Sequence, residues 1–187
     1  MTVKDVLKTA AAYLDRRDII SRLDGGAAEN SERTDEDIKL LLECYNVTAE
    51  EIAAEYFRLK ATETLVSKNG FISCGDFKND PITVLSVKNE SGGKARAAVK
   101  PDGIYTAENK VTVEYEYIPP KRGVDDESDF SGTSIRERVL AFGAVTEFCL
   151  IKGAFEEAVN YHSRYVEGVK GSLSNRKPVR LKERKWL

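Results

Sequence analysis

Apolar side chains near the start of the chain recur at steps of three and four residues, the spacing of one face of an α-helix. Thr2 is a suitable N-cap for this helix, and Asp5 stands three positions later, where a capping-box carboxylate is found. A second apolar group, Ile19 to Leu23, either continues the same helix or forms a short second one, and Gly25-Gly26 ends it. The apolar face of the first helix consists of Val3, Val6, Leu7, Ala10, Ala11 and Leu14.

The longest apolar stripe predicts a helix that begins after Thr34, with Asp37 as its capping partner. The stripe keeps its phase as far as Leu59, so one long helix is the preferred interpretation. A break near Asn46 is the alternative, because Thr48 begins a second capping-box sequence. Asn46 lies beside the stripe and is expected to be a core asparagine bonded to backbone. The stripe consists of Ile38, Leu41, Leu42, Tyr45, Ala49, Ile52, Ala53 and Tyr56.

From Thr64 to Ile118 the apolar period becomes alternating, which is typical of strands covered on one face. In the clearest strand, 111–117, valine and tyrosine alternate with threonine and glutamate, and Pro119-Pro120 ends the pattern. A spacing of about 8–12 residues predicts a compact antiparallel meander or a small sandwich. The predicted strands are 65–66, 71–72, 82–87, 95–99 and 111–117, with turns at 68–70, 79–81, 91–93 and 101–103.

Two further helices are predicted after the sheet. The first covers residues 134 to about 151, with Ser134 and Glu137 as a capping box, and the second covers 154 to about 169 after a turn at Lys152-Gly153. The expected core-facing positions are Val139, Phe142, Gly143, Thr146, Cys149 and Leu150 on the first helix, and Phe155, Val159, His162 and Val166 on the second.

Glycines near the end of the chain carry two further predictions. Gly143 stands in a helix interior, where glycine costs roughly 1 kcal/mol relative to alanine, so a close helix contact is expected there. The small residues Gly168, Gly171, Ser172, Ser174 and Asn175 indicate that the chain loosens before a basic tail.

These elements predict an α+β fold: a helical bundle of about four helices with an inserted antiparallel β-sheet sub-domain and an extended C-terminal arm. The chain has 187 residues, which is enough for one domain carrying such an insertion. The expected parts are a helical body at 1–62 and 131–170, the β sub-domain at 63–120, an acidic loop at 121–130 and a basic C-terminal arm at 171–187.

Composition narrows the class of protein. Apolar types make up 41% and charged types 32% of the residues, so a modest core can form. The apolar runs are far below the ~20 residues of a membrane helix, and the first residues lack the pattern of a signal peptide. We therefore expect a protein that stays in the cytoplasm and has no membrane partner. The three cysteines are widely separated, which indicates neither a disulfide framework nor a zinc site.

Charge is unevenly distributed. The net charge is −2, yet six of the last twelve residues are Lys or Arg and only one is Glu. Apolar side chains, including the single tryptophan, interleave with these charges, which favours a tail that docks on another protein. The acidic run at 125–129 is expected to be a solvated loop. The expected partner-binding residues of the tail are Arg176, Lys177, Val179, Arg180, Leu181, Arg184, Lys185, Trp186 and Leu187.

No catalytic signature is present in the sequence. The only histidine, His162, has no nucleophile elbow or paired metal-binding histidine to act with. Cys149 stands among apolar residues and is expected to be an inert core thiol, whereas Cys74 beside a turn is a candidate for exposure. The acidic run at 125–127 lacks the glycine turn and closing glutamate of a calcium loop. We therefore expect no enzyme activity, cofactor or metal.

Several stretches together resemble the head-to-tail connector, or portal adaptor, proteins of tailed bacteriophages and prophages. They are the long helix Ile38–Tyr56, the strands ending in Val111–Pro119, the helix pair around Phe142–Cys149, Phe155-Glu156-Glu157-Ala158, Arg164-Tyr165, and the tail ending in Arg184-Lys185-Trp186-Leu187. The resemblance lies in this layout and covers most of the chain. It implies a structural virion protein without catalytic residues.

The resemblance also implies partners and a location. A connector subunit forms a homo-oligomeric ring, usually of twelve copies, beneath the portal protein, which its C-terminal arm grips. Its far face receives tail or nozzle proteins, and genomic DNA passes through the channel without sequence-specific contact. The expected location is the head-tail interface of the virion, after assembly in the host cytoplasm. The alternative is a nucleic-acid-associated or regulatory binding module that uses the basic tail.

Overall fold

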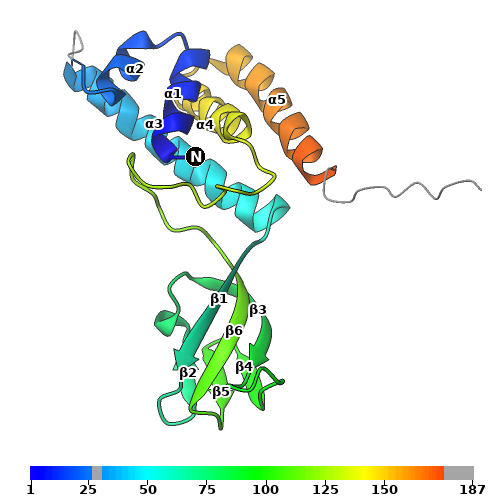
Figure 1. Cartoon of the computed structure of the whole chain (residues 1–187). Coiled ribbons are helices and arrows are strands. Elements are labelled where there is room, and N and C mark those ends of the chain that lie inside the picture. Colours follow the sequence, from blue (N-terminus) through cyan, green and yellow to red (C-terminus); the bar gives the residue numbers. More distant parts are fainter. Residues whose placement is uncertain (27–30, 175–187) are drawn as a thin grey trace, which may run out of the picture. The chain divides into compact units, whose positions relative to one another are not determined.

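A computed structural model describes residues 1–26 and 31–174 of the chain (Figure 1). Over these residues the fold is α+β, as predicted, with five α-helices and two three-stranded antiparallel sheets. The chain divides into two compact units. A helical unit contains the residues up to Thr48 and from Arg122 on, and a β unit consists of Ala49–Lys121.

The first helix of the helical unit, α1 (Val3–Tyr13), begins as predicted. The Thr2 hydroxyl accepts a hydrogen bond from the Asp5 amide at 3.2 Å, and the Asp5 carboxylate accepts one from the Thr2 amide at 2.9 Å. The chain then turns through Asp15, which has a left-handed backbone with φ of 52°. A separate short helix, α2 (Arg17–Leu23), follows, so the second of the two alternatives is confirmed.

The long helix α3 (Ser31–Glu51) begins earlier than predicted and runs through Asn46 without a break. Thr34 and Asp37 are therefore not its cap. Both residues lie within the helix, and their side chains are buried. The Thr34 hydroxyl donates a hydrogen bond to Asp18 at 3.1 Å, and the Asp37 carboxylate forms an ion pair with Arg16 at 2.7 Å. These charge-assisted bonds join α3 to α2 through Asp18 and to the α1–α2 turn through Arg16.

The chain leaves α3 through a single π-helical turn, η1 (Ile52–Tyr56). The helix expected to reach Leu59 is wrong in its last turn, because Leu59 already begins strand β1. Asn46 is the backbone-bonded asparagine that was predicted: its side chain donates to the Arg122 carbonyl at 3.1 Å and accepts from the Arg122 amide at 2.8 Å.

The β unit contains six strands in two sheets. One sheet has the order β1 (Leu59–Val66), β6 (Lys110–Tyr117), β3 (Pro81–Lys88), and the other has the order β2 (Phe71–Ser73), β5 (Gly103–Thr106), β4 (Ala97–Lys100). The first strand thus pairs with the last, which excludes a simple meander. Strand β5 was missed, because it has only four residues and begins at Gly103, inside the predicted turn at 101–103.

Apolar side chains from both sheets share one small core. Ile72 and Ile104 come from the second sheet, and the inward residues of β6 come from the first. Alternation along β6 is as predicted: Val111, Val113 and Tyr115 are at most 1% exposed. The structure therefore agrees with the small-sandwich alternative. Burial, reinforced by the hydrogen bond to Glu63, raises the pKa of Tyr115 to about 12.

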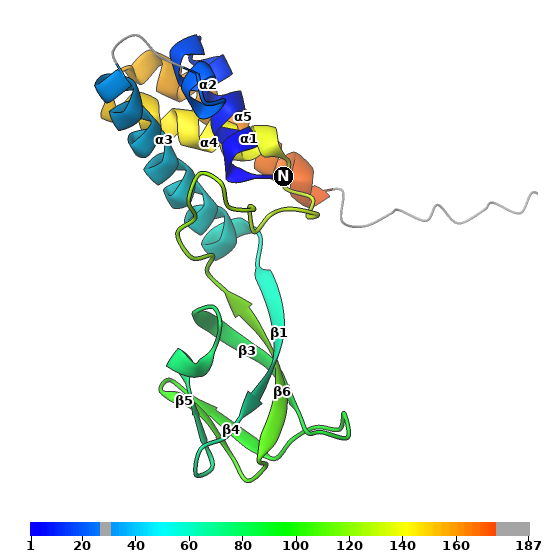
Figure 2. The same cartoon turned by 60° about the vertical axis from the view of Figure 1, so that its left-hand side comes forward.

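The last two helices of the helical unit are α4 (Glu137–Ile151) and α5 (Phe155–Ser174). Figures 1 and 2 show them side by side, with α1 on the other flank of α4. The predicted cap at Ser134 is wrong, because the N-cap is Arg136. The predicted turn at Lys152-Gly153 is present, with Gly153 at φ of 76°. The main buried side chains of the helical unit are Leu7, Ile19, Leu41, Tyr45, Phe130, Ile135, Leu140 and Val145.

Two glycines let the helices approach closely. A Cβ atom on Gly143 would lie 2.2 Å from Cγ2 of Thr48 on α3, which confirms the predicted close contact. A Cβ atom on Gly168 of α5 would lie 2.9 Å from Cγ2 of Val139 on α4. Gly168 therefore allows close helix packing, and the expectation that the chain loosens at this residue is wrong. Because α5 continues to Ser174, residues 171–174 are helical and not the start of an arm.

Candidate interaction surface

The predicted partner-binding residues of the tail lie outside the described residues. They are Arg176, Lys177, Val179, Arg180, Leu181, Arg184, Lys185, Trp186 and Leu187. The structure brings the chain to this segment along α5, whose last residue is Ser174. The end of α5 is therefore the last described part of the chain before the tail.

An exposed apolar patch occupies the corner between α4 and α5. Leu150 and Ile151 at the end of α4 are 44% and 59% exposed, and Phe155 and Val159 at the start of α5 are 65% and 69% exposed. Phe155 and Val159 stand one helical turn apart and therefore share a face. Single exposed apolar residues are ordinary, but a gathered group of this kind is typical of a surface that binds a partner. We call these four residues the corner patch.

The predicted orientation of α5 is wrong. Phe155, Val159 and His162 were expected to face the core, but all three are exposed. The helix buries a second apolar phase instead, at Ala158, Tyr165 and Val169. Small Ala158 and Gly168 allow α5 to lie close to α4, which the bulkier first phase would prevent.

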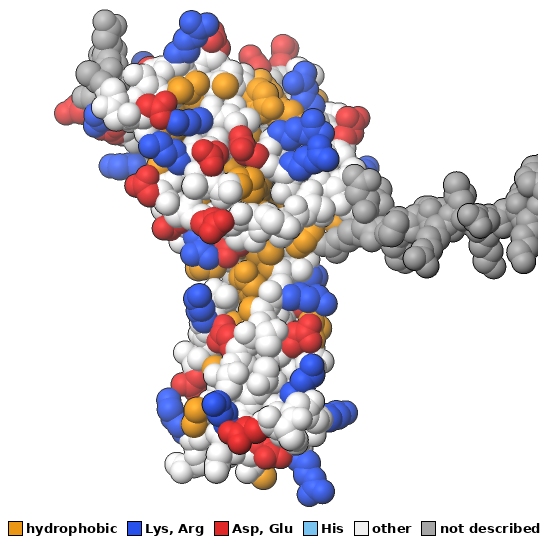
Figure 3. Space-filling model, viewed as in Figure 1, with side chains coloured by type: hydrophobic (Ala, Val, Ile, Leu, Met, Phe, Trp, Pro, Cys, Tyr) orange, Lys and Arg blue, Asp and Glu red, His pale blue; other side chains and the backbone are white. Residues whose placement is uncertain are grey.

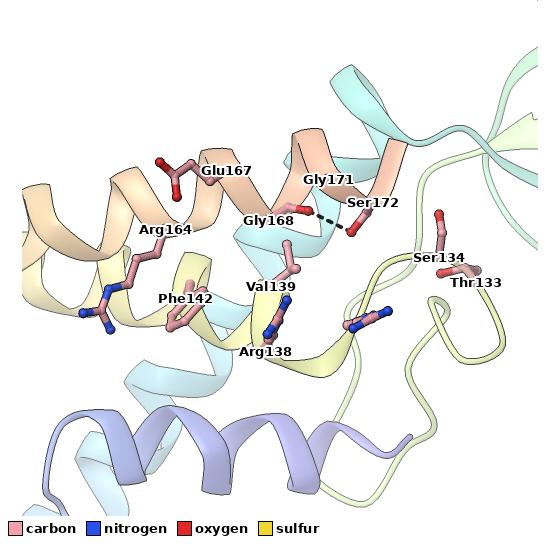
Figure 4. A pocket seen from close by; sticks show the side chains of 11 residues that line it. Thr133, Ser134, Arg138, Val139, Phe142, Arg164, Glu167, Gly168, Gly171 and Ser172 are labelled. Atoms are coloured by element: carbon pink, nitrogen blue, oxygen red, sulfur yellow. Dashed lines mark hydrogen bonds between the residues drawn. The ribbon is translucent and has the colours of Figure 1, made fainter. Parts of the chain in front are cut away.

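A groove of about 680 Å³ runs between the start of α4 and the second half of α5. Arg138, Val139 and Phe142 of α4 and Arg164, Glu167 and Gly168 of α5 line it, and Figure 4 shows the two helices between which it lies. The loop before α4 adds Thr133, Ser134 and Arg136 at one end. Ser134 Oγ is buried there without a hydrogen-bond partner among the described residues.

The groove carries positive charge. Three of the side chains that line it are Arg136, Arg138 and Arg164, and Glu167 is its single acidic lining residue. The Arg164 guanidinium stands 5.9 Å from the centre of the Phe142 ring and 5.8 Å from that of Tyr161, so aromatic faces hold it without neutralising it. Figure 3 shows basic side chains gathered over α5, next to apolar ones. We call this feature the arginine groove.

The acidic loop at residues 121–130 precedes the arginine groove in the sequence. Its backbone is held to the start of the chain: the Asp126 carbonyl accepts from the Val3 amide at 2.9 Å, and the Ser128 amide donates to the Met1 carbonyl at 3.2 Å. Asp129 forms a two-point ion pair with Arg122, at 2.6 and 2.7 Å. Asp125 and Glu127 are exposed and form no ion pair among the described residues.

Other candidates for chemistry are dispersed. His162 is exposed on α5, with its ring 6.2 Å from that of Tyr165. All three cysteines are free, and Cys44 and Cys149 are buried. Burial raises the pKa of Cys149, as expected for an inert thiol, and raises that of Cys44 to about 12. Within residues 1–26 and 31–174, no three His, Cys, Asp or Glu residues stand close enough to hold a metal ion.

The groove arginines were not predicted as a site. Arg136 and Arg138 stand two positions apart in the sequence, but Arg164 reaches them only because α5 packs back on α4. The corner patch was visible as apolar residues on both sides of Lys152-Gly153, yet the pattern alone did not show which phase of α5 faces solvent.

No protein-family model matches the sequence, and no curated protein matches it. Among the described helices, none combines the length and the apolar character needed to cross a lipid bilayer.

Proposed function

We propose that this chain is a structural virion protein: a head-to-tail connector subunit that assembles into a ring and binds the portal through its C-terminal tail. Copies of the chain contact one another around the ring, tail or nozzle proteins bind the far side, and genomic DNA passes through the central channel. The chain would act at the head-tail interface, after assembly in the host cytoplasm. No chemical step is part of this function.

The observation that carries the proposal is the corner patch. Four large apolar side chains, between 44% and 69% exposed, stand within ten residues of one another where α4 ends and α5 begins. Leaving such a group in water is unfavourable by roughly 25 cal/mol per Å² of apolar surface, so a partner that covers it gains stability. This exposed group therefore supports a surface that another copy or a partner covers in an assembly.

The layout of the chain supports the same proposal. A helical unit, an inserted β unit and a basic, tryptophan-containing tail follow the order that the resemblance to connector proteins implies. The tail offers an apolar anchor, Trp186, among arginine and lysine side chains, the composition that protein interfaces favour at their centre.

Portal binding by the tail is the direct test. The full chain and a chain ending at Ser174 are each mixed with the portal protein encoded in the same genome, and the complex is measured by sedimentation. We expect the full chain to bind and the shortened chain to stay free, although its helical unit remains folded by circular dichroism. Equal binding of the two chains would contradict the proposed role of the tail.

A matched pair of single variants refines this test. Trp186→Ala removes the proposed anchor and should weaken portal binding about thirtyfold, the effect of losing about 2 kcal/mol at an interface centre. Glu183→Ala alters the same segment without removing an apolar or basic side chain, and its affinity should change less than about threefold. Equal affinities for Trp186→Ala and the unaltered chain would mean that the tryptophan is not the anchor.

A further inference from the structure

The arginine groove is positively charged and the acidic loop is negatively charged, but their exposed charges do not pair with each other within one copy of the helical unit. Arg136 and Arg138 are exposed and form no ion pair among the described residues. The third arginine, Arg164, contacts aromatic rings. On the loop, Asp125 and Glu127 are likewise exposed and unpaired within the described chain. Each surface therefore lacks the counter-charge that the other presents.

The acidic loop is held in shape before any partner arrives. Hydrogen bonds from Val3 and to Met1 hold its backbone, and the Asp126 carboxylate accepts from the Gly123 amide at 2.7 Å, which fixes the turn. Asp125 and Glu127 stand on either side of Asp126 and therefore project from an ordered segment. Binding such a segment requires little loss of conformational entropy.

We propose that the acidic loop of one copy of this chain binds in the arginine groove of the next copy. Asp125 and Glu127 would pair with Arg136, Arg138 and Arg164, because guanidinium groups bind carboxylates through paired hydrogen bonds. The buried Ser134 hydroxyl lies at the end of the groove that also carries Arg136. It is a further hydrogen-bond donor that lacks a partner among the described residues. The inference rests on the proposed function, since it names a contact between subunits of the assembly.

A nucleic acid is the competing occupant of a groove with three arginines. Glu167 on the α5 wall opposes a phosphate chain, as do the remaining acidic residues of this chain, whose net charge is negative despite its basic tail. A protein segment bearing two carboxylates and many neutral peptide groups fits this mixed wall better. The second copy is therefore the occupant that the charges favour.

The geometry of the contact has a consequence for assembly. The groove and the loop are different patches of the same chain, so in the proposed ring the contact repeats head-to-tail from each copy to the next, whereas a reciprocal exchange between two copies would stop at a dimer. Exposed charge pairs contribute mainly to specificity and association rate, whereas apolar burial contributes affinity. The groove and loop would thus select the neighbour, and the contact should weaken as salt increases.

A charge exchange between two full-length variants tests this contact. The groove variant carries Arg136→Glu and Arg138→Glu, and the loop variant carries Asp125→Lys and Glu127→Lys. Assembly of each is measured by light scattering at low salt, alone and on the portal. We expect each variant alone to assemble at least about tenfold more weakly than the unaltered chain. An equimolar mixture of the two variants should recover assembly. The acidic groove of the first variant then meets the basic loop of the second, and the unaltered loop of the first still meets the unaltered groove of the second.

Matched controls separate this effect from a change in net charge. One control carries Arg17→Glu with Lys39→Glu, and the other carries Glu32→Lys with Glu36→Lys. They reverse exposed charges of the same helical unit outside both surfaces, change the net charge by the same amount as the test variants, and should assemble like the unaltered chain. Circular dichroism verifies that every variant is folded. Failure of the mixture to recover assembly would overturn the inference.

Two further outcomes locate the error. If the unaltered chain assembles and the groove variant assembles equally well but loses affinity for DNA, the groove binds nucleic acid and the inference is wrong while the proposed function stands. If the unaltered chain assembles neither alone nor on the portal, the proposed function is wrong, and the inference falls with it.

Discussion

The side chain of Asn46 forms hydrogen bonds with both the backbone carbonyl and the backbone amide of Arg122, although the two residues are 76 positions apart in sequence. Its amide nitrogen donates to the Arg122 carbonyl at 3.1 Å, and its amide oxygen accepts from the Arg122 nitrogen at 2.8 Å. These two hydrogen bonds take the place of the ones that a neighbouring β-strand would form with the Arg122 backbone. It holds the chain against α3 at the point where the sequence returns to the helical unit.

The Asn46→Ala variant should therefore unfold more easily. It removes two hydrogen bonds to the Arg122 backbone in a half-buried position, which should lower the free energy of unfolding by about 2 kcal/mol. Urea unfolding of the helical signal measures the change. Asn160→Ala on the exposed face of α5 is the control and should change stability little. Equal stability of the two variants would show that water replaces Asn46 without loss.

Glycines at two places in the last helices should respond in opposite directions to alanine. Gly143→Ala places a methyl group 2.2 Å from Thr48 Cγ2, so α3 and α4 must separate, at a cost of about 1–3 kcal/mol. Gly171→Ala meets nothing within 4 Å and should stabilise α5 by up to about 1 kcal/mol. Thermal unfolding of both variants measures the difference.

A second substitution tests the cause of the Gly143 effect. Thr48→Ala removes the side chain that the new methyl group would strike, and the double variant should recover part of the lost stability. Loss of stability in the double variant equal to the sum of the two single losses would mean that Thr48 is not the obstacle.

The buried carboxylate of Asp37 should be important for stability. Its side chain is 3% exposed and binds both Arg16 and Lys152 at 2.7 Å, so it links the α1–α2 turn, α3 and the end of α4. Asp37→Asn should lower the free energy of unfolding by about 2 kcal/mol, because Lys152 loses its counter-charge and Arg16 keeps only Asp18. Asp35→Asn removes an exposed partner of Arg22 and should have little effect. A larger loss in Asp35→Asn than in Asp37→Asn would contradict this assignment.

The same network predicts loss of stability in acid. The hydrogen bond from Arg16 lowers the pKa of Asp18 from 3.8 to about 2. Burial opposes ionisation of Asp37, yet the hydrogen bonds from Lys152 and Arg16 lower its pKa as well. Carboxylates with a lowered folded pKa stabilise fully above their unfolded value and lose this contribution as the pH falls through the folded one. Thermal unfolding should therefore show a decline between pH 4 and about 2, smaller in the Asp18→Asn variant. An equal decline in that variant would exclude Asp18 as a cause.

Local sequence rules predicted the elements of this fold better than their ends. The Thr2–Asp5 capping box is present because nothing else competes for those groups, and β6 alternates because one face covers the core. Thr34, Asp37 and Ser134 have the right residue types for caps, but tertiary partners or the loop before α4 take these side chains elsewhere. A cap is read from neighbours in sequence, whereas these contacts come from distant segments.

The candidate surface was predictable only in part. Two apolar phases exist on α5, and the sequence does not show which one meets α4; the choice follows from the close contact of Gly168 with Val139. The arginine groove depends on the same packing. The tail residues from Arg176 to Leu187 lie outside the described residues, so their role stays a prediction from sequence.

Electron microscopy of the full chain bound to its portal tests the central claim most directly, with a Phe155→Ser, Val159→Ser variant of the corner patch beside it. Both side chains are more than half exposed, so the variant should fold normally. The account predicts a closed ring of copies on the portal for the unaltered chain, and scattered or incomplete occupancy for the variant. Single, unassociated copies of the unaltered chain, or a complete ring of the variant, would contradict it.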